Sequence, residues 1–451
     1  MTDHHKTAQP LETLQAFAAA CGGTLMNGMS AQAFVQRPFA GVCTDSRQLR
    51  AGQVFFALRG DRFDGHAFVG DAIAKGAAVV VMERNRPVQS CASSGVHAHG
   101  FGTAFWATDD PSRVQTVVIM VDDSRKALGY LATQHRKSFP LPVIAVAGSN
   151  GKTTTKELIA SVLRQKLRTV WSEASFNNDI GVPLTLLKVS QTHQAAVLEV
   201  GTNHPGELEA LLRIARPQYG VLTNIGREHL EFFGDLAGVA KEEGTLAEML
   251  PPNGKLFIVG DNPWTEAIAE RAFASVVKVG FRTCNDWRLS NVRCEKDGVT
   301  FSVEAPRAAF SGEYHIGLLG RHQAMNAVLA IAMGVEMGLD PESIRRGLAA
   351  CEPAKMRLQS WELNGVRVLD DAYNANADSV LAALQTLIEL PCKGRRVAVL
   401  GEMAELGAQS EAAHEEVGRR AAEMGVGQLF TVGAMRQVMG RGARAAGLNR
   451  V

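Results

Sequence analysis

The sequence predicts an α/β protein of three blocks with a parallel sheet at its centre. Short apolar runs typical of buried strands alternate with helical stretches along most of the 451 residues. A Gly-rich turn, Gly148-Ser-Asn-Gly-Lys-Thr-Thr154, directly follows one such run and precedes a helical stretch. Hydrophobic residues make up 46% of the chain and charged residues 21%, which is typical of a chain that buries full cores.

The first block covers residues 1–121. Its strand candidates are the apolar runs 54–58, 78–82 and 117–121, separated by helical stretches. The Ser/Gly/His-rich segment 93–102 indicates a loop or a local insertion.

The second block covers residues 122–354. A helical stretch at 124–137 is followed by strand candidates at 143–147, 195–200 and 220–222, and a helix is expected to begin near Thr154. Strands that alternate with helices favour a parallel sheet covered on both faces. Residues 296–316 show alternating polarity with glycines at turns and predict a short antiparallel patch.

The third block covers residues 355–451. Strand candidates at 366–369, 397–400 and 429–432 are separated by helical stretches, which predicts a second, smaller α/β sheet.

Composition and charge argue against several classes of protein. Forty-seven basic residues against 46 acidic ones leave no basic excess, so we do not expect nucleic acid binding. Seven cysteines without a C-x-x-C pair indicate reduced thiols in a cytoplasmic protein. The N-terminus lacks the apolar stretch of a signal peptide, and no apolar run is long enough to span a bilayer, so we expect no membrane insertion.

The Gly-rich turn is the strongest chemical signal. Backbone N–H groups in such a turn and at the following helix N-terminus favour phosphate binding. Lys152 can reach the β- and γ-phosphates of a nucleotide, and the Thr153 hydroxyl can hold Mg²⁺. The pattern is a variant, because Val146 stands where the usual phosphate loop has its first glycine. The alternative is a tight strand–helix turn with an incidental lysine.

Other polar residues follow predicted strands. Glu199 lies near the end of the run 195–200, where a carboxylate beside a phosphate loop can ligate Mg²⁺, although a solvated glutamate is common there. His229 follows the strand and turn at 220–226, and taken alone such a histidine is more often structural. The loop 370–376 holds two acids and two amides, which could equally be turn chemistry.

Together these residues resemble the Mur ligase family. The turn at 148–154 is similar to that family's phosphate loop, which departs from the usual pattern in the same way. The resemblance extends over nearly the whole chain. The further matching positions, in family order, are Glu199, Gly201, 223–226, His229, 320–322, Asn326, Arg357 and Asp371.

Longer stretches resemble the branch of the family that adds D-alanyl-D-alanine. These stretches are 176–187, 370–376 and 400–407, and in the first block 44–47, 58–60 and 64–66 resemble a UDP-sugar domain. The resemblance implies a UDP-MurNAc-peptide-binding domain at 1–121, a central ATP-binding domain of the P-loop type at 122–354 and a Rossmann-like ligase domain at 355–451. It implies an ATP-dependent, monomeric ligase that joins D-alanyl-D-alanine to UDP-N-acetylmuramoyl-tripeptide through an acyl phosphate.

The resemblance also assigns roles to residues. Residues 148–154 would hold ATP, with Lys152 spreading the charge of the γ-phosphoryl group. Thr153 and Glu199 would ligate a first Mg²⁺ and His229 a second. Asn326 would contact adenine, Asp371 ribose, and Arg357 would serve as a hinge that closes the third domain. The remaining expected substrate contacts are Ser46, Arg47, Asp64, His66, Asn177, Asn178, Tyr373, Asn374 and Asn376.

The chain departs from the family at the position of a carbamylated lysine. Members commonly carry this lysine fourteen residues after the metal-binding histidine, and here Glu243 stands there. Lys241 is two residues earlier, and on a helix it would point roughly 200° away. Since Glu243 already carries a carboxylate, we expect it to replace the carbamate as a ligand of the second Mg²⁺.

A second departure concerns the third domain, which in the family continues with further strand–helix units. This chain ends at Val451, so an incomplete third domain is expected. Two alternatives stay open: a ligase like folylpolyglutamate synthetase, and a nucleotide-binding homologue with impaired catalysis. Asn177-Asn178 and the stretch 373–376 argue against the first alternative.

Overall fold

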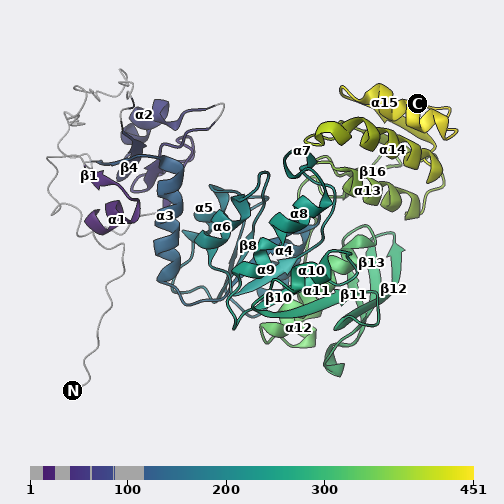
Figure 1. Cartoon of the computed structure of the whole chain (residues 1–451), viewed down its shortest axis with the longest axis horizontal. Helices are drawn as coiled ribbons and strands as arrows, with labels where there is room; N and C mark the ends of the chain where they lie inside the picture. Colours follow the sequence, from purple (N-terminus) through teal and green to yellow (C-terminus); the bar gives the residue numbers. More distant parts are fainter. Residues whose placement is uncertain (1–13, 26–40, 61–62, 85, 87–115) are drawn as a thin grey trace. The chain divides into compact units, whose positions relative to one another are not determined.

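The computed structural model describes residues 14–25, 41–60, 63–84, 86 and 116–451, and its ribbon is drawn in Figure 1. The predicted loop at 93–102 lies outside these ranges. The chain divides into two compact units, Met1–Pro140 with Asp179–Gln191, and Leu141–Asn178 with Thr192–Val451. Within the described ranges no helix is long and apolar enough to cross a membrane. The division into three domains at 121 and 354 stays a prediction.

The first unit is a five-stranded sheet in the order β1-β5-β4-β3-β2, in which only β1 is antiparallel. Val54 and Phe56 of β3 pack in one core, and Phe55 between them packs in another. Both faces are therefore buried, as expected for parallel strands. The elements are α1 (Leu14–Ala20), β1 (Thr24–Leu25), β2 (Val42–Cys43), β3 (Val54–Phe56), η2 (Gly65–Phe68), α2 (Val69–Ala74), β4 (Val79–Glu83), β5 (Val117–Val121), α3 (Ser124–Lys137) and α5 (Gly181–Leu186).

The second unit contains a nine-stranded sheet in the order β14-β13-β12-β11-β10-β9-β6-β8-β7. Neighbouring strands from β7 to β12 pair in parallel, and β12, β13 and β14 pair antiparallel. The predicted antiparallel patch at 296–316 is thereby confirmed. The strands are β6 (Val143–Ala147), β7 (Thr169–Trp171), β8 (Ala195–Glu199), β9 (Tyr219–Leu222), β10 (Lys255–Val259), β11 (Ser275–Gly280), β12 (Trp287–Glu295), β13 (Gly298–Glu304) and β14 (Gly312–Ile316).

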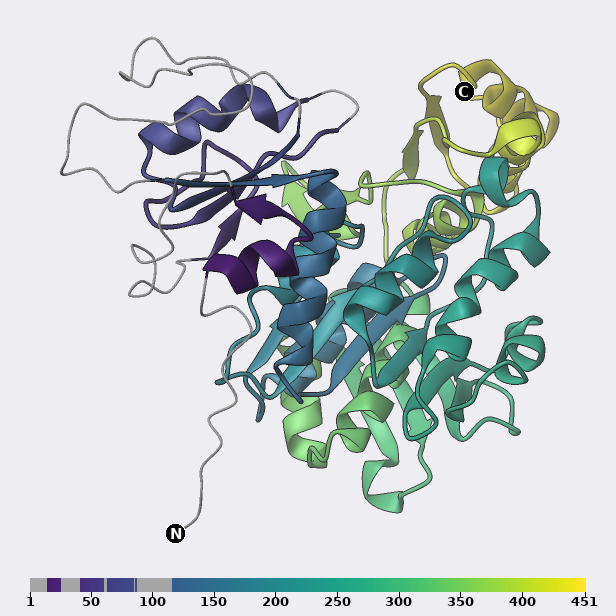
Figure 2. The same cartoon turned by 60° about the vertical axis from the view of Figure 1, so that its left-hand side comes forward.

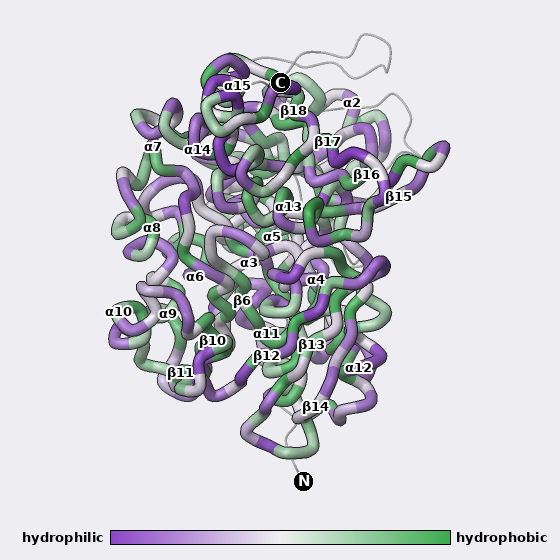
Figure 3. Tube along the Cα trace, turned by 90° about the vertical axis from the view of Figure 1, so that its right-hand side faces the viewer, coloured by the Kyte–Doolittle hydropathy of each residue, from purple (hydrophilic) through white to green (hydrophobic). Residues whose placement is uncertain are grey.

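Helices cover both faces of this sheet (Figure 2). Helices α4, α11 and α12 pack against one another in one layer, and α6, α8 and α9 form another. Hydrophobic colouring follows α11, whereas α14 of the third block is mostly hydrophilic (Figure 3). The helices are α4 (Lys152–Leu163), α6 (Glu207–Ala215), α7 (Leu230–Phe233), α8 (Leu236–Glu243), α9 (Thr245–Met249), α10 (Thr265–Ala269), α11 (His322–Glu336) and α12 (Pro341–Ala349), with η3 at Ala308–Phe310.

The third block holds two small sheets where the sequence predicted one. β15 (Gln359–Leu363) and β16 (Val366–Asp370) form an antiparallel hairpin, and β17 (Val397–Leu400) pairs in parallel with β18 (Gln428–Thr431). The hairpin closes through Asn364 and Gly365, whose φ angles of +51° and +75° suit a two-residue type I′ turn. Because of this turn β16 pairs with β15, whereas β17 pairs with β18 in the other sheet. The helical elements are α13 (Ala377–Glu389), η4 (Gly407–Gln409), α14 (Ser410–Glu423) and α15 (Arg436–Ala445).

Candidate active site

The phosphate loop connects β6 to α4 and depends on two glycines. Gly148 and Gly151 have φ angles of +112° and +82°, which side chains other than glycine rarely adopt. A Cβ atom on Gly148 would lie 2.4 Å from the Thr223 hydroxyl oxygen, and one on Gly151 would lie 2.8 Å from Oδ1 of Asn326. Both positions therefore require glycine for conformation and for space.

The turn after β9 braces this loop. The backbone N–H of Ser149 donates to the Asn224 carbonyl at 2.9 Å, and that of Asn150 donates to Asn224 Oδ1 at 2.7 Å. The Thr223 hydroxyl donates to the Asn150 carbonyl at 2.6 Å. Because the first N–H groups of the loop are engaged, a phosphate would meet mainly those at the start of α4. Residues 223–226 are among the positions that resemble the family, but no role was predicted for them from the sequence.

Lys152 lies at the start of α4 among buried carboxylates. Its Nζ donates to the Gly148 carbonyl at 2.5 Å and to Glu228 Oε2 at 3.1 Å. Burial lowers the pKa of Lys152, but the charges of Glu228, Glu243 and Glu199 outweigh burial and raise it. The lysine is therefore held as a cation, as charge stabilisation on a phosphoryl group requires.

Glu199 ends β8 and is 1% exposed. Its Oε1 accepts a hydrogen bond from Asn177 Nδ2 at 3.0 Å, whereas its Oε2 is buried without a partner. Burial raises the pKa of Glu199 above its usual value, although the positive charges of Lys156 and Lys152 oppose this shift. Asn177 is thus placed to orient the predicted metal ligand, while Asn178 is exposed.

Glu243 lies at the end of α8 and is 1% exposed, whereas Lys241 is exposed. Oε2 of Glu243 accepts the backbone N–H of Gly148 at 2.7 Å, which ties α8 to the phosphate loop. Burial, followed by the charge of Glu228, raises the pKa of Glu243 well above its usual value. The expectation that Lys241 points away from Glu243 agrees with these exposures.

Glu228 was missed by the sequence reasoning. It is 5% exposed, pairs with Lys152, and its charge raises the pKa of Glu243. A single glutamate beside a histidine carries no spacing signal, and only the folded turn brings it to the phosphate loop.

The donor set suits a divalent cation held jointly with a nucleotide. Three buried carboxylate oxygens lack a hydrogen-bond partner: Oε2 of Glu199, Oε1 of Glu228 and Oε1 of Glu243. In the part of the chain that the structure describes, no three His, Cys, Asp or Glu side chains lie close enough to hold a metal ion by themselves. Mg²⁺ commonly uses one or two carboxylates and completes its shell with phosphate oxygens and water, so these residues fit such a site.

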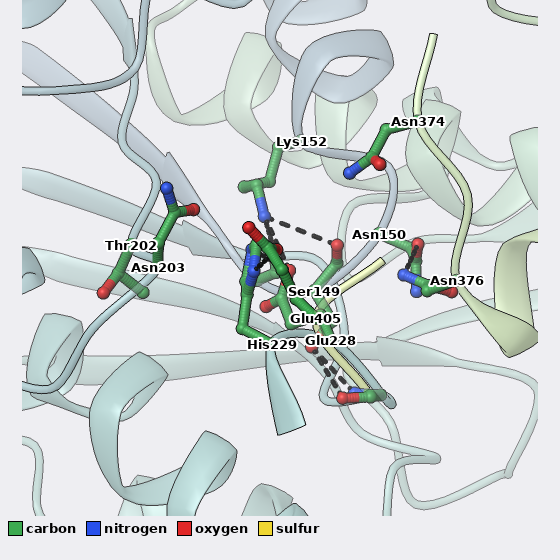
Figure 4. A network of polar contacts seen from close by, with 12 residues as sticks. Ser149, Asn150, Lys152, Thr202, Asn203, Glu228, His229, Asn374, Asn376 and Glu405 are labelled. Carbon is green, nitrogen blue, oxygen red and sulfur yellow. Dashed lines mark hydrogen bonds and ion pairs between the residues drawn. The ribbon is translucent and has the colours of Figure 1, made fainter. Parts of the chain in front are cut away.

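His229 follows β9 and is the N-cap residue of α7, with a φ angle of +47°. Its Nδ1 donates to the carboxylate of Glu405, and its Nε2 lies 3.9 Å from Glu228 Oε2. Figure 4 shows Lys152, Glu228, His229 and Glu405 grouped at the loop. His229, a predicted metal ligand, therefore lies next to Glu228, which in turn pairs with Lys152.

The predicted nucleotide residues fall in two places. Asn326 of α11 lies against Gly151 and donates from Nδ2 to Gln323 at 2.8 Å. Asp371 accepts the backbone N–H of Leu358 at 3.1 Å, and the structure thereby joins it to the segment that carries Arg357. Burial raises the pKa of Asp371 to about 6. The Arg357 guanidinium lies 4.3 Å from the ring centroid of Tyr373, and its buried Nε has no partner.

Asn376 links the loop 370–376 to the phosphate loop. It caps α13 by accepting the Ser379 N–H at 2.8 Å, and its Nδ2 donates to Asn150 Oδ1 at 2.9 Å (Figure 4). Asn374 is exposed and accepts the backbone N–H of Ala375 at 2.9 Å. Asn376 therefore has a structural role in addition to any contact with substrate.

The four predicted residues of the first unit lie around β2, η2 and β4. Arg47 is exposed and donates to Asp45 from Nε at 2.9 Å and from Nη2 at 2.8 Å. Ser46 is buried, and its carbonyl accepts Lys75 Nζ at 2.7 Å. His66 is 2% exposed, accepts the Glu83 N–H at 2.9 Å and bonds Asp64 through Nδ1. Asp64 and His66 therefore hold the conformation of their loop through hydrogen bonds. The guanidinium group of Arg47 is accessible to a ligand.

Three domains of one protein family match successive parts of the chain. "Mur ligase family, catalytic domain" matches residues 38–136, "Mur ligase middle domain" matches 146–334, and "Mur ligase, glutamate ligase domain" matches 356–449.

Individual relatives match over most of their length. The chain is 34% identical over 433 residues to the UDP-N-acetylmuramoyl-tripeptide–D-alanyl-D-alanine ligase of Bacillus subtilis, covering 96% of this chain and 87% of that protein. A crystal structure of MurF from Acinetobacter baumannii matches with a TM-score of 0.82 and 30% identity, covering 96% of this chain and 88% of that one. MurF ligase from Thermotoga maritima in complex with ADP matches with a TM-score of 0.73 and 26% identity, covering 88% and 86%. The chain therefore belongs to the Mur ligase family of ATP-dependent ligases.

Proposed function

We propose that the chain joins D-alanyl-D-alanine to UDP-N-acetylmuramoyl-tripeptide with the hydrolysis of ATP to ADP and phosphate, in the cytoplasm. The observation that carries this substrate assignment is the identity of 34% over 96% of the chain to the Bacillus subtilis ligase named for these substrates. The reaction gives UDP-N-acetylmuramoyl-pentapeptide, a precursor of peptidoglycan.

The site supports activation of a carboxylate by phosphoryl transfer. A carboxylate oxygen of the tripeptide attacks the γ-phosphorus of ATP, the bond to ADP breaks, and an acyl phosphate forms. The dipeptide amine then attacks the acyl carbon, loses a proton, and phosphate leaves. In this proposal Lys152, the first residue of α4, would spread the charge of the γ-phosphoryl group together with the N-terminus of that helix.

Thr153, Glu199, His229 and Glu243 would hold Mg²⁺ in this proposal. Bound there with the nucleotide, Mg²⁺ would neutralise charge on the transferred phosphoryl group. Asn177 orients Glu199, and the Gly148 N–H fixes Glu243, so both carboxylates are held before a ligand arrives.

The experiment combines the purified chain with ATP, UDP-N-acetylmuramoyl-tripeptide and D-alanyl-D-alanine. We expect phosphate release that depends on the dipeptide, and a product whose mass equals both substrates joined with loss of one water. Release of phosphate with a folate and glutamate instead would favour the folylpolyglutamate synthetase alternative. Nucleotide binding without turnover of any of these mixtures would favour the impaired homologue.

We also infer that Glu243 replaces the carbamylated lysine of related enzymes. Its carboxylate is buried, tied to the phosphate loop, and retains one oxygen without a partner. A carboxylate supplied by the chain needs no CO₂, so turnover should be unchanged after bicarbonate is stripped and the enzyme is pulsed with mild acid.

A pair of variants tests this role of Glu243. Glu243→Gln keeps the oxygen that accepts the Gly148 N–H but cannot ionise when a cation binds, so Mn²⁺ affinity and kcat should each fall about 10-fold or more. Lys241→Ala changes an exposed side chain on the same helix and should leave both quantities unchanged. A silent Glu243→Gln together with an inactive Lys241→Ala would overturn the inference.

A further inference from the structure

The third block contacts the turn that carries His229. The backbone carbonyl of Glu405 accepts the N–H of Glu231 at 3.0 Å, and Gln409 Nε2 donates to the Gly234 carbonyl at 3.0 Å. Gly407 approaches so closely that a Cβ atom on it would lie 3.1 Å from the Cα of Glu231. Residues 405–409 thus form a docking segment against residues 229–234.

Within this contact, one side chain of the docking segment reaches the ring of His229. Nδ1 of His229 donates to the Glu405 carboxylate, so the neutral ring keeps its lone pair on Nε2. The Nε2 atom lies on the side of Glu228, which pairs with Lys152. The His229 side chain is 13% exposed, so few other partners compete for it.

The backbone alone does not hold this arrangement. His229 and Glu405 have φ angles of +47° and +60°, in the left-handed region that residues other than glycine adopt infrequently. Such conformations persist where surrounding contacts hold them, and they are frequent at functional sites. The hydrogen bond between Nδ1 of His229 and Glu405 adds a side-chain contact that orients the ring.

The loop that carries Glu405 is fixed from behind by a buried histidine. His414 of α14 is fully buried; its Nδ1 donates to the Ser410 carbonyl at 2.7 Å, and its Nε2 accepts the Met403 N–H at 2.9 Å. Met403 and Leu406, on either side of Glu405, are each 2% exposed. The loop that carries Glu405 is therefore held in place by buried side chains and by the hydrogen bonds of His414.

We propose that Glu405 is a positioning residue that sets the tautomer and orientation of His229 for metal binding, and does so only when the third block is docked. The proposal rests on the metal role of His229 in the proposed function. A carboxylate that accepts the second ring N–H of a metal-binding histidine fixes the ring and raises its basicity. Because Glu405 comes from the third block, docking of that block completes the metal site and restricts phosphoryl transfer to the docked enzyme.

The first test measures Mn²⁺ binding by electron paramagnetic resonance, with the full chain and ADP. Glu405→Gln should weaken the Mn²⁺ site that depends on His229 by about 10-fold to 100-fold. Gln409→Ala removes one exposed hydrogen bond but keeps the Glu405–His229 and Glu405–Glu231 contacts, so the block should stay docked and Mn²⁺ affinity should match that of the unchanged enzyme. Unchanged Mn²⁺ affinity in Glu405→Gln, or an equal loss in Gln409→Ala, would overturn the proposal.

The second test reads the ring directly by ¹⁵N resonance of labelled histidine in the metal-free chain. At a pH high enough for the ring to be neutral, the His229 signals, identified by their absence in His229→Gln, should report a protonated Nδ1 and an unprotonated Nε2. Glu405→Gln should shift them toward a mixture of tautomers, whereas Gln409→Ala should not. Identical signals in all three chains would contradict the positioning role.

A third variant separates failure of this inference from failure of the proposed function. If His229→Gln leaves Mn²⁺ affinity unchanged, the metal role of His229 is wrong, and the positioning role is wrong with it. If His229→Gln weakens Mn²⁺ binding and Glu405→Gln does not, the proposed function stands and only the positioning role fails.

Discussion

At the scale of single residues, a contiguous motif is readable and a tertiary contact is not. Roles for Lys152 and Thr153 could be predicted from sequence because the loop, its strand and its helix follow one another directly. Glu228 and Asn224 reach the same loop from more than seventy residues away, through hydrogen bonds that only folding creates. Glu405 had no assigned role for the same reason.

Lys152 carries the first prediction at this scale. Lys152→Ala removes the cation that we propose spreads the γ-phosphoryl charge, so ligation should fall by at least about 10³-fold. Circular dichroism should show a folded chain, since the loop is also braced by Thr223 and Asn224. Near-normal turnover in this variant would contradict the prediction that residues 148–154 form a phosphate loop.

Asp371 gives a prediction for pH dependence. Burial raises the pKa of its carboxyl to about 6, so in the folded chain it is charged above that pH and becomes neutral below it. If the charged form binds ribose, ADP affinity measured by calorimetry should fall as the pH drops from 8 to 5. Asp371→Asn should bind ADP more weakly at pH 8 and lose most of this pH dependence. Parallel pH profiles in both chains would contradict the ribose role.

The raised pKa of Asp371 also has a consequence for stability with a definite sign. The folded chain binds this proton more tightly than the unfolded chain, so stability is greatest below the unfolded pKa near 4 and is lost as the pH rises through about 6. Asp371→Asn removes that loss and should raise Tm relative to the unchanged chain at pH 8. At pH 4 the two Tm values should be closer.

At the scale of elements, the sequence predicted the strands that have strong apolar runs. It did not always predict which strands they pair with. The central parallel sheet and its antiparallel edge were found because alternation with helices and alternating polarity are local patterns. The hairpin of β15 and β16 was missed because β15 is largely exposed and lacks an apolar run. The Asn364-Gly365 pair between them was the available signal, since it favours a type I′ turn.

The phosphate loop as an element gives a prediction with a matched control. Gly151→Ala adds a Cβ atom 2.8 Å from Asn326 Oδ1 at a φ angle of +82°, so ATP affinity should fall about 10-fold or more because the loop must shift. Gly425→Ala introduces a Cβ atom at a φ angle of +91° with no heavy atom within 4 Å. Both variants should lose stability, and only the first should lose nucleotide affinity. Equal ATP affinities would show that the Gly151 contact is unimportant.

At the scale of the whole molecule, the family resemblance supplied what local patterns could not. Composition and periodicity predicted α/β blocks, but the assignment of substrates to blocks came from stretches such as 44–47 and 400–407. The contacts also group α3 with the first unit, although the predicted boundary lay before that helix. Packing of its apolar side chains, Ala127, Leu128 and Leu131, against the first sheet accounts for this grouping.

Division of labour between the blocks is tested through Arg47. Its guanidinium is accessible and belongs to the first unit, which we propose binds UDP-N-acetylmuramoyl-tripeptide. Arg47→Ala should raise the KM for this substrate about 10-fold and leave the KM for ATP nearly unchanged. A selective rise in the KM for ATP would show that the block has been assigned wrongly.

The most direct measurement of the central claim follows oxygen from the tripeptide carboxylate into phosphate. The chain is given ATP, D-alanyl-D-alanine and UDP-N-acetylmuramoyl-tripeptide labelled with ¹⁸O in its terminal carboxylate. If that carboxylate attacks the γ-phosphorus beside Lys152, each released phosphate should carry one ¹⁸O atom. Phosphate that contains oxygen only from ATP and water, with pentapeptide still formed, would contradict activation through an acyl phosphate.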